Sequence, residues 1–365
     1  MSLMFEKTLD RIREGVGSAF PCAAVAVGVG HRVFVRQFFG HRQLQPIAFP
    51  VTEDTLFDLA SVSKVVATTM VALKMLENGT LSLHDRISRW FADTGHFEDC
   101  EIIHLMTHTS GLPAGLPLYN MTHEKGEVAR SILQANRCYE TGTQVLYSCM
   151  GYIVLQKILE KVGNAPLDVL AKEYVFTPLE MKNACYNPAL AKNSTPLCPV
   201  AATERNANTG EWTVGHVHDE NAFFLDGIAG NAGVFATLDD MIAFTSMCAT
   251  RGIAKNGTVF LSKETFDLAI KNRTPDKAES RGLGFQLKGS QDFPGGTLFS
   301  QGSYGHTGFT GTSFYIDAQT GLWGILLTNA VHYGRENRNA YFALRKEFYD
   351  TMITEYKTER NGRKQ

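Results

Sequence analysis

Residues 57–64 read Phe57-Asp58-Leu59-Ala60-Ser61-Val62-Ser63-Lys64, and the chain continues as VVATTMVALKMLENG to Gly79. Apolar residues recur at helical spacing after Ser61, and Gly79 follows them as a helix-ending glycine. The pattern predicts a central, buried helix over residues 61–78, opened by Ser61. Because residues i and i+3 of a helix share one face, about 5–6 Å apart, Lys64 can reach the hydroxyl of Ser61.

This S-x-x-K pair has the elements of an activated nucleophile. A serine needs a base to take its proton, and a lysine serves as that base when burial or nearby positive charge lowers its pKa. The helix N-terminus and the apolar helix supply both conditions at Lys64, and the backbone N–H of Ser61 can help to stabilise an oxyanion. The alternative is a serine N-cap followed by a surface lysine, since about one chance match is expected in a chain this long.

Two other segments add to this pair. Tyr147-Ser148-Cys149 lies at a predicted loop-to-helix junction, and Tyr304-Gly305-His306-Thr307-Gly308 on a short predicted strand. A tyrosine near a lysine can act as a base, and a histidine on an edge strand can bind substrate or hold that tyrosine. Gly308 allows the substrate backbone to approach closely. The alternatives are a packed core tyrosine and a surface histidine.

Predicted strands stand at both ends of the chain. Residues 23–29 and 33–39 form a predicted hairpin, and residues 311–316 and 322–329 are again strand-like. The middle is largely helical, and a closing helix is expected over 337–356. The pattern predicts an α/β (α+β) protein with a central antiparallel sheet flanked by helices. We expect one discontinuous domain from residues 1–80 and 281–365, a mostly helical domain from 81–280, and an active site between them.

Composition narrows the function classes. The 365 residues carry 35 basic and 37 acidic side chains, which disfavours charge-driven binding to nucleic acid. No apolar run approaches the roughly 20 residues that span a bilayer. The cysteines number seven and form no C-x-x-C pair, which disfavours a disulfide framework or zinc ribbon and favours a reducing, cytoplasmic location. The sequence leaves two questions open: whether a leader has been removed before Met1, and what the oligomeric state is.

The order S-x-x-K, then Tyr147-Ser148-Cys149, then His306-Thr307-Gly308 resembles the serine β-lactamase and penicillin-binding protein superfamily. The closest likeness is to its class C β-lactamase-like branch, which includes family VIII esterases and penicillin-binding-protein-4B-like hydrolases. Further matching stretches are residues 57–60, 105–113, 178–181 and 282–285, and the likeness spans about residues 20–331. The resemblance implies a β-lactamase-like fold with the site between the sheet and a helical domain.

The resemblance also implies roles for single residues. Ser61 would be the acylated nucleophile, and Lys64 and Tyr147 would share general-base and general-acid duty. His306 stands where the family has Lys or His, and Gly308 lies beside it. The backbone N–H of Phe309 would be the second oxyanion donor. The implied substrates are small molecules, namely esters, β-lactams or peptides ending in D-amino acids such as cell-wall fragments, and no cofactor is expected.

The sequence departs from the family pattern at Cys149, where relatives carry an asparagine that bonds the lysine and the substrate amide. Cysteine is a weak donor and acceptor, and His306 in place of lysine can be neutral at pH 7. Both changes favour an esterase or peptidase-like activity over efficient β-lactam hydrolysis. The alternative for Cys149 is a small buried filler.

Residues 215–222 spell GHVHDENA, and similar stretches occur in penicillin-binding-protein-4B-like hydrolases. They predict a loop lining the site, with Asp219 or His218 touching substrate. A metal-dependent hydrolase built on His216 and His218 is one alternative, although a hydrogen-bonded loop explains the pattern and no metal is expected. Another is a non-catalytic binding or scaffold protein with the same fold, for which Cys149 is the only support.

Overall fold

The computed structural model describes residues 4–188, 199–206, 209–289, 292–336 and 338–362. Its strands are β1 (Cys22–Val29), β2 (Arg32–Gln43), β3 (Phe49–Pro50), β4 (Phe57–Asp58), β5 (Cys185–Tyr186), β6 (Val234–Ala236), β7 (Gln286–Leu287), β8 (Tyr304–Thr307), β9 (Ser313–Ile316) and β10 (Leu322–Thr328). Its α-helices are α1 (Glu6–Gly15), α2 (Met70–Glu77), α3 (Ile102–Met106), α4 (Leu118–Met121), α5 (Val128–Leu133), α6 (Cys149–Gly163), α7 (Leu167–Ala171), α8 (Glu220–Phe224), α9 (Leu238–Ala249), α10 (Lys263–Ile270) and α11 (Asn339–Gly362).

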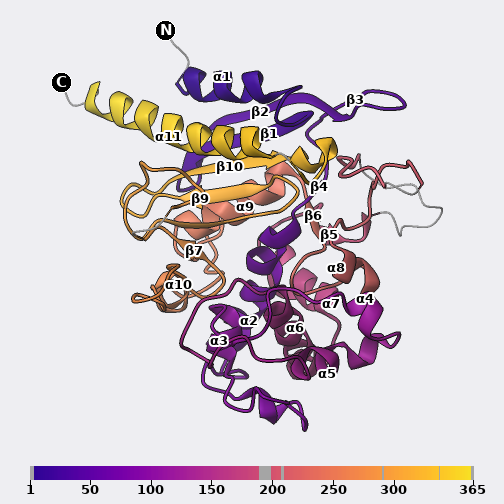
Figure 1. Cartoon of the computed structure of the whole chain (residues 1–365). Coiled ribbons are helices and arrows are strands. Elements are labelled where there is room, and N and C mark those ends of the chain that lie inside the picture. Colours follow the sequence, from indigo (N-terminus) through magenta and orange to yellow (C-terminus); the bar gives the residue numbers. More distant parts are fainter. Residues whose placement is uncertain (1–3, 189–198, 207–208, 290–291, 337, 363–365) are drawn as a thin grey trace.

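Strands from both ends of the chain form one antiparallel sheet, as predicted. Its order is β3-β2-β1-β10-β9-β8-β7, and β1 pairs with β10 from Ala23↔Thr328 to Val29↔Leu322. The predicted N-terminal hairpin is confirmed by the pairing of β1 with β2. The fold is therefore mixed α/β with a large antiparallel sheet flanked by helices (Figure 1).

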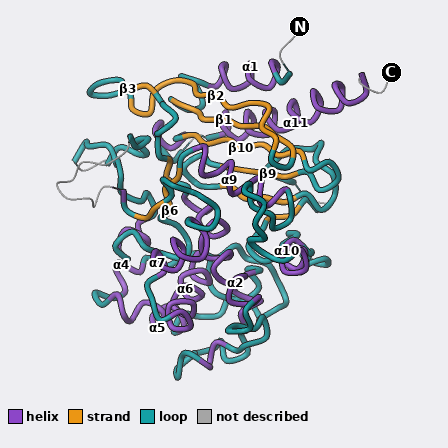
Figure 2. Tube along the Cα trace, turned by 180° about the vertical axis from the view of Figure 1, so that it is seen from behind, coloured by secondary structure: helices purple, strands orange, loops and turns teal. Residues whose placement is uncertain are grey.

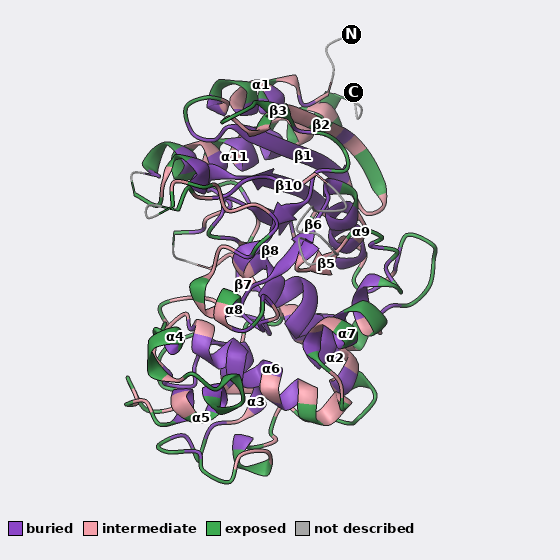
Figure 3. Cartoon of the chain, turned by 90° about the vertical axis from the view of Figure 1, so that its right-hand side faces the viewer, coloured by how far each residue is buried: buried purple, intermediate pink, exposed green. Residues whose placement is uncertain are grey.

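The sheet separates two apolar cores, because successive side chains of a strand point to opposite faces. On β1, Ala24 and Ala26 face the larger core, whereas Ala23, Val25 and Val27 face the smaller one. Helices α1 and α11 cover the smaller core and lie side by side, as Figures 1 and 2 both show. Figure 3 shows that the central strands are buried between these layers.

Helix α9 packs on the other side of the sheet, against β1, β9 and β10. This helix comes from the range that we assigned to the helical domain, so part of residues 81–280 belongs with the sheet. The division into two domains otherwise stays a prediction. Helices α2 to α8 lie below the sheet in Figure 1. In the described ranges no helix has the length and apolar character needed to cross a membrane.

The segment opened by Ser61 differs from the predicted α-helix. Residues Ala60–Val62 form a 3₁₀ turn, Lys64–Thr69 form a π-helix, and regular α2 begins only at Met70. Two side chains of this stretch bond away from the helix. Ser63 Oγ accepts from Val234 N at 3.0 Å, and Thr68 Oγ1 donates to Gly230 O at 2.8 Å. These bonds to residues 230–234 accompany the wider turns, and such turns are frequent at functional sites.

Candidate active site

A buried aspartate holds the turn that presents Ser61. Strand β4 pairs with β6 and ends at Asp58, whose carboxylate accepts the N–H groups of Ala60 at 2.8 Å and His218 at 2.7 Å. Ala60 has a φ of +46°, which is uncommon for a residue with a Cβ. Burial raises the pKa of Asp58 against the opposing effect of these two hydrogen bonds. Asp58 therefore ties the residue before Ser61 to the segment containing His218.

Lys64 reaches Ser61, as the S-x-x-K spacing predicts. Its side chain is fully buried, and Nζ lies 3.1 Å from Ser61 Oγ, 2.9 Å from Asn231 O and 3.5 Å from Cys149 Sγ. Burial alone would lower the pKa of Lys64, but attraction to Cys149 and Tyr147 outweighs it and the pKa is raised. The expected lowering was therefore wrong, because it neglected the groups that face the ammonium.

Tyr147 lies at the centre of an aromatic and cationic cluster. Its ring centre is 4.9 Å from Lys64 Nζ, 4.6 Å from the ring of His108 and 5.9 Å from the ring of His306. The phenolic oxygen is buried and finds no hydrogen-bond partner in the described part of the chain. The structure thus brings Tyr147 and His306 to the Ser61–Lys64 pair, which spacing alone could not establish.

His306 faces the cluster as a neutral acceptor. Its Nδ1 lies 2.8 Å from Thr307 O, and a carbonyl accepts, so Nδ1 carries the hydrogen and Nε2 keeps a lone pair. Burial and the charges of Arg281 and Lys64 lower the pKa of His306 to about 3. The predicted edge position was wrong, because β8 lies between β7 and β9. However, β7 pairs only with Tyr304 and Gly305.

The turn after β8 is fastened to the chain just before Ser61. Thr310 Oγ1 donates to Asp58 O at 2.7 Å, and Thr312 Oγ1 donates to Leu59 O at 3.0 Å. A Cβ at position 308 would lie 2.4 Å from Leu59 O, so only glycine allows this approach. The backbone of Gly308 and Phe309 is therefore held beside Ser61.

The side chains of Phe309 and Asp219 have other partners. The Phe309 ring is exposed and stacks on His218 with ring centres 5.6 Å apart. Asp219 caps α8 by accepting Ala222 N at 2.8 Å, and its charge contributes to the raised pKa of Lys64. His218 Nε2 lies 3.0 Å from Glu204 Oε2. The predicted loop thus packs near the site, with Asp219 and His218 already engaged within the protein.

Three polar residues of the cluster were missed by sequence reasoning. His108 packs against Tyr147 with the two rings tilted by 44°, Arg281 lies with Cζ 5.3 Å from the Tyr147 ring centre, and Asn231 provides the carbonyl that accepts from Lys64. His108 falls in the quoted stretch 105–113, and Arg281 directly precedes the stretch 282–285. These two stretches could have pointed to His108 and Arg281, but no chemical role was predicted for either stretch.

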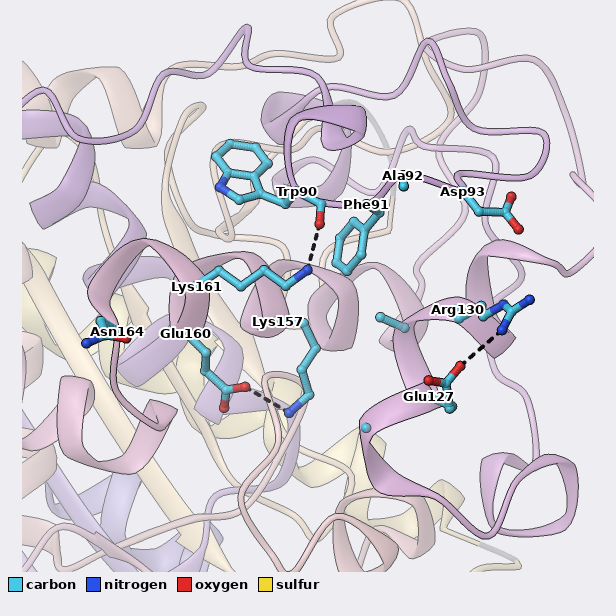
Figure 4. A pocket seen from close by; sticks show the side chains of 12 residues that line it. Trp90, Phe91, Ala92, Asp93, Glu127, Arg130, Lys157, Glu160, Lys161 and Asn164 are labelled. Atoms are coloured by element: carbon cyan, nitrogen blue, oxygen red, sulfur yellow. Dashed lines mark hydrogen bonds and ion pairs between the residues drawn. The ribbon is translucent and has the colours of Figure 1, made fainter.

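A separate cavity lies between α5, α6 and residues 90–93 (Figure 4). Its volume is about 540 Å³, and none of the predicted site residues lines it. Its cations are paired: Lys161 donates to Trp90 O at 2.6 Å, and Lys157 and Arg130 form ion pairs with glutamates. Across the described ranges, no three His, Cys, Asp or Glu side chains gather in a way that could hold a metal ion.

The fold and this cluster define a serine hydrolase of the β-lactamase and penicillin-binding protein type. The family model described as "Beta-lactamase" matches residues 9–347, and the chain belongs to that family. A Bacillus subtilis (strain 168) relative named "N-acetylmuramyl-L-alanine amidase" is 30% identical over 364 residues, covering 89% of this chain and 81% of the relative. An Escherichia coli (strain K12) relative named "Putative D-alanyl-D-alanine carboxypeptidase" is 31% identical over 317 residues, covering 79% and 71%.

A solved structure agrees on the fold. "EstCE1, a hydrolase with promiscuous acyltransferase activity" superposes with a TM-score of 0.75 at 21% identity, covering 96% of this chain and 98% of that one. At this level of identity the likeness concerns the fold alone. The predicted superfamily is confirmed, together with the predicted antiparallel-sheet fold and an enzyme of the serine hydrolase class.

Proposed function

We propose that the chain is an acyl-transferring hydrolase that forms an acyl-enzyme on Ser61. The observation that carries the proposal is the 3.1 Å contact between Lys64 Nζ and Ser61 Oγ. A nucleophile, a group that moves its proton and an oxyanion site are what acyl transfer requires. Ser61, Tyr147 with Lys64, and the N–H groups of Ser61 and Phe309 are the candidates for these three parts.

The proposed first step transfers the Ser61 proton to the oxygen of Tyr147. Lys64 Nζ donates to Ser61 Oγ and to Asn231 O, so we assign the role of proton acceptor to Tyr147. Ser61 Oγ attacks the substrate carbonyl carbon, and the negative oxygen that forms is bound by the two N–H groups. The bond to the leaving group then breaks, and Tyr147 returns its proton to that group. In the second half, water attacks the acyl carbonyl carbon and gives a proton to Tyr147; the bond to Ser61 Oγ then breaks, and Tyr147 returns the proton to Ser61 as the acid product leaves.

We favour esters and D-amino-acid peptides over β-lactams as the acyl donors. The neutral His306 offers no positive charge, and the Cys149 thiol is a weak hydrogen-bonding group beside Lys64. The names of the two relatives, an amidase of N-acetylmuramyl-L-alanine and a D-alanyl-D-alanine carboxypeptidase, support a substrate related to cell-wall peptides. The competing proposal is a non-catalytic binding protein, for which the Cys149 substitution is the only argument.

The experiment is intact-protein mass spectrometry after incubation with a fluorophosphonate and, separately, with a labelled penicillin. We expect a stoichiometric fluorophosphonate adduct that maps to Ser61, and no adduct on the Ser61→Ala variant. A long-lived penicillin adduct would favour a peptidase or esterase, and rapid penicillin turnover a β-lactamase. If the folded wild type forms no adduct with either reagent, the binding-protein alternative replaces the proposal.

A further inference from the structure

Tyr147 lies against two cations, and only one of them belongs to the S-x-x-K motif. The first is Lys64, with Nζ 4.9 Å from the ring centre, and the second is Arg281, with Cζ 5.3 Å from it. A nearby positive charge favours the deprotonated form of a phenol. Because Lys64 Nζ donates to Ser61 Oγ and to Asn231 O, the proposed mechanism assigns proton acceptance to Tyr147 and needs that deprotonated form as its base.

Arg281 is held firmly in place. Its side chain is buried, its N–H donates to Thr274 Oγ1 at 2.8 Å, and its carbonyl accepts from Arg273 N at 2.7 Å. The guanidinium donates through Nε and Nη2 to Glu279. Its Nη1 is buried and unpartnered within the described ranges, which is a costly arrangement for a charged donor. The packing therefore keeps the Arg281 charge at the cluster, although one of its buried donors has no partner there.

Charged and titratable groups face Tyr147 from every element around it. Those that contact its ring are Lys64, His108, His306 and Arg281. One step further out, Cys149 lies beside Lys64, Tyr152 beside His108 and Glu279 on Arg281, and Asp219 acts on Lys64. Burial lowers the pKa of both His108 and His306, so neither ring is charged at neutral pH. Lys64 and Arg281 are thus the two positive charges of this set.

We propose that Arg281 is a positioning residue of the proton-transfer step, which stabilises the deprotonated form of Tyr147 that accepts the Ser61 proton. It supplies the second positive charge that the neutral His306 does not. The inference rests on the proposed acyl-transfer function and adds to it a residue outside the three motifs. Glu279 partly offsets the charge of Arg281, so the pair sets the strength of the effect.

The test is the pH dependence of kcat/KM between pH 5 and 10 on p-nitrophenyl acetate, an uncharged ester. In Arg281→Gln we expect the acid limb to move up by about one pH unit, the effect of one partly offset charge at this range. At pH values below the limb the rate falls about tenfold, and at high pH it converges on the wild-type rate. Arg281→Lys keeps the charge and should stay within about threefold of wild type at every pH.

Two further variants separate electrostatics from packing. Glu279→Gln removes the offsetting charge from a side chain that is 43% exposed, and should move the acid limb down. Arg273→Gln is the matched control, because its guanidinium donates to Leu268 O at 3.1 Å, and it should leave the profile unchanged. If Arg281→Gln does not fold, the direction of the Glu279→Gln shift still decides the question.

Three outcomes overturn the inference. The first is an unshifted acid limb in folded Arg281→Gln and in Glu279→Gln. The second is an equal loss at all pH values that Arg281→Lys does not restore, which would mean a structural role. The third is a loss carried by KM with kcat unchanged at every pH, which would mean a substrate-binding role. A wild type without a Ser61 adduct would instead overturn the proposed function, and the inference with it.

Discussion

The neutral state of His306 predicts a measurable loss of stability in mild acid. Its pKa is lowered to about 3 by burial and by the charges of Arg281 and Lys64, whereas an unfolded histidine titrates near its ordinary value of about 6.5. The unfolded chain therefore binds a proton that the folded chain rejects. Stability is lost as the pH falls through about 6.5, and the loss continues down to the folded-state pKa.

The size of the effect follows from the width of this window. Between pH 6.5 and 4.5 the folded ring stays neutral while the unfolded ring goes from half to fully protonated, so the cost approaches about 1.4 kcal/mol per pH unit and His306 alone accounts for about 2 kcal/mol. The assay is urea unfolding of wild type and His306→Gln at half-unit pH steps over this range. We expect the free energy of unfolding of wild type to fall by about 2 kcal/mol more than that of the variant.

The difference between the two proteins isolates His306, because the remaining buried groups titrate in both. His108 also loses stability in acid, since burial lowers its pKa, whereas the raised pKa of Asp58 acts in the opposite direction. Both contributions largely cancel in the comparison. Parallel curves for wild type and variant from pH 6.5 to 4.5, or an NMR titration of His306 near pH 6.5, would refute the reasoning.

Three further substitutions test the site. Lys64→Met should reduce Ser61 acylation by a fluorophosphonate by about 10²-fold or more and also lower the melting temperature, because the attraction that raises the pKa of Lys64 and its bond to Asn231 O are both lost. Gly308→Ala should lower both acylation rate and melting temperature, since its Cβ would meet Thr312 Oγ1 at 2.1 Å, and an unchanged rate would contradict the proposed oxyanion turn. Cys149→Asn should speed penicillin acylation about tenfold while leaving p-nitrophenyl acetate hydrolysis within about threefold, with Cys149→Ser as the control.

The sheet could be predicted because its signal is local. Strand alternation and turn residues predicted β1, β2, β9 and β10 to within four residues at each end, and placing them in one sheet needed only the rule that apolar faces share a core. The helix opened by Ser61 was predicted in place but not in form. Its π-helical stretch accompanies hydrogen bonds from Ser63 and Thr68 to residues 230–234, and no spacing rule contains a partner so distant in sequence.

In the candidate site, too, contacts between residues close in sequence could be predicted, and contacts between distant residues could not. Ser61 and Lys64 are three residues apart, so helix geometry brings them together, and the structure has them in contact. Tyr147 and His306 were joined to them by resemblance to family motifs. Arg281 and His108 belong to no chemical motif that we weighed, and they meet Tyr147 only after the chain has folded.

The direction of the pKa shift of Lys64 shows why the charge state of a buried side chain is hard to predict from sequence. Burial was foreseen, and by itself it lowers the pKa of a lysine. The outcome is the reverse, because Cys149 and Tyr147 face the ammonium from a segment more than 80 residues away and outweigh burial. At His306 burial and the charges of Arg281 and Lys64 act in the same direction, and the pKa falls. Of the two basic side chains at the Tyr147 ring, Lys64 thus has a raised pKa and His306 a lowered one. Tyr147, the proposed base, lies between them.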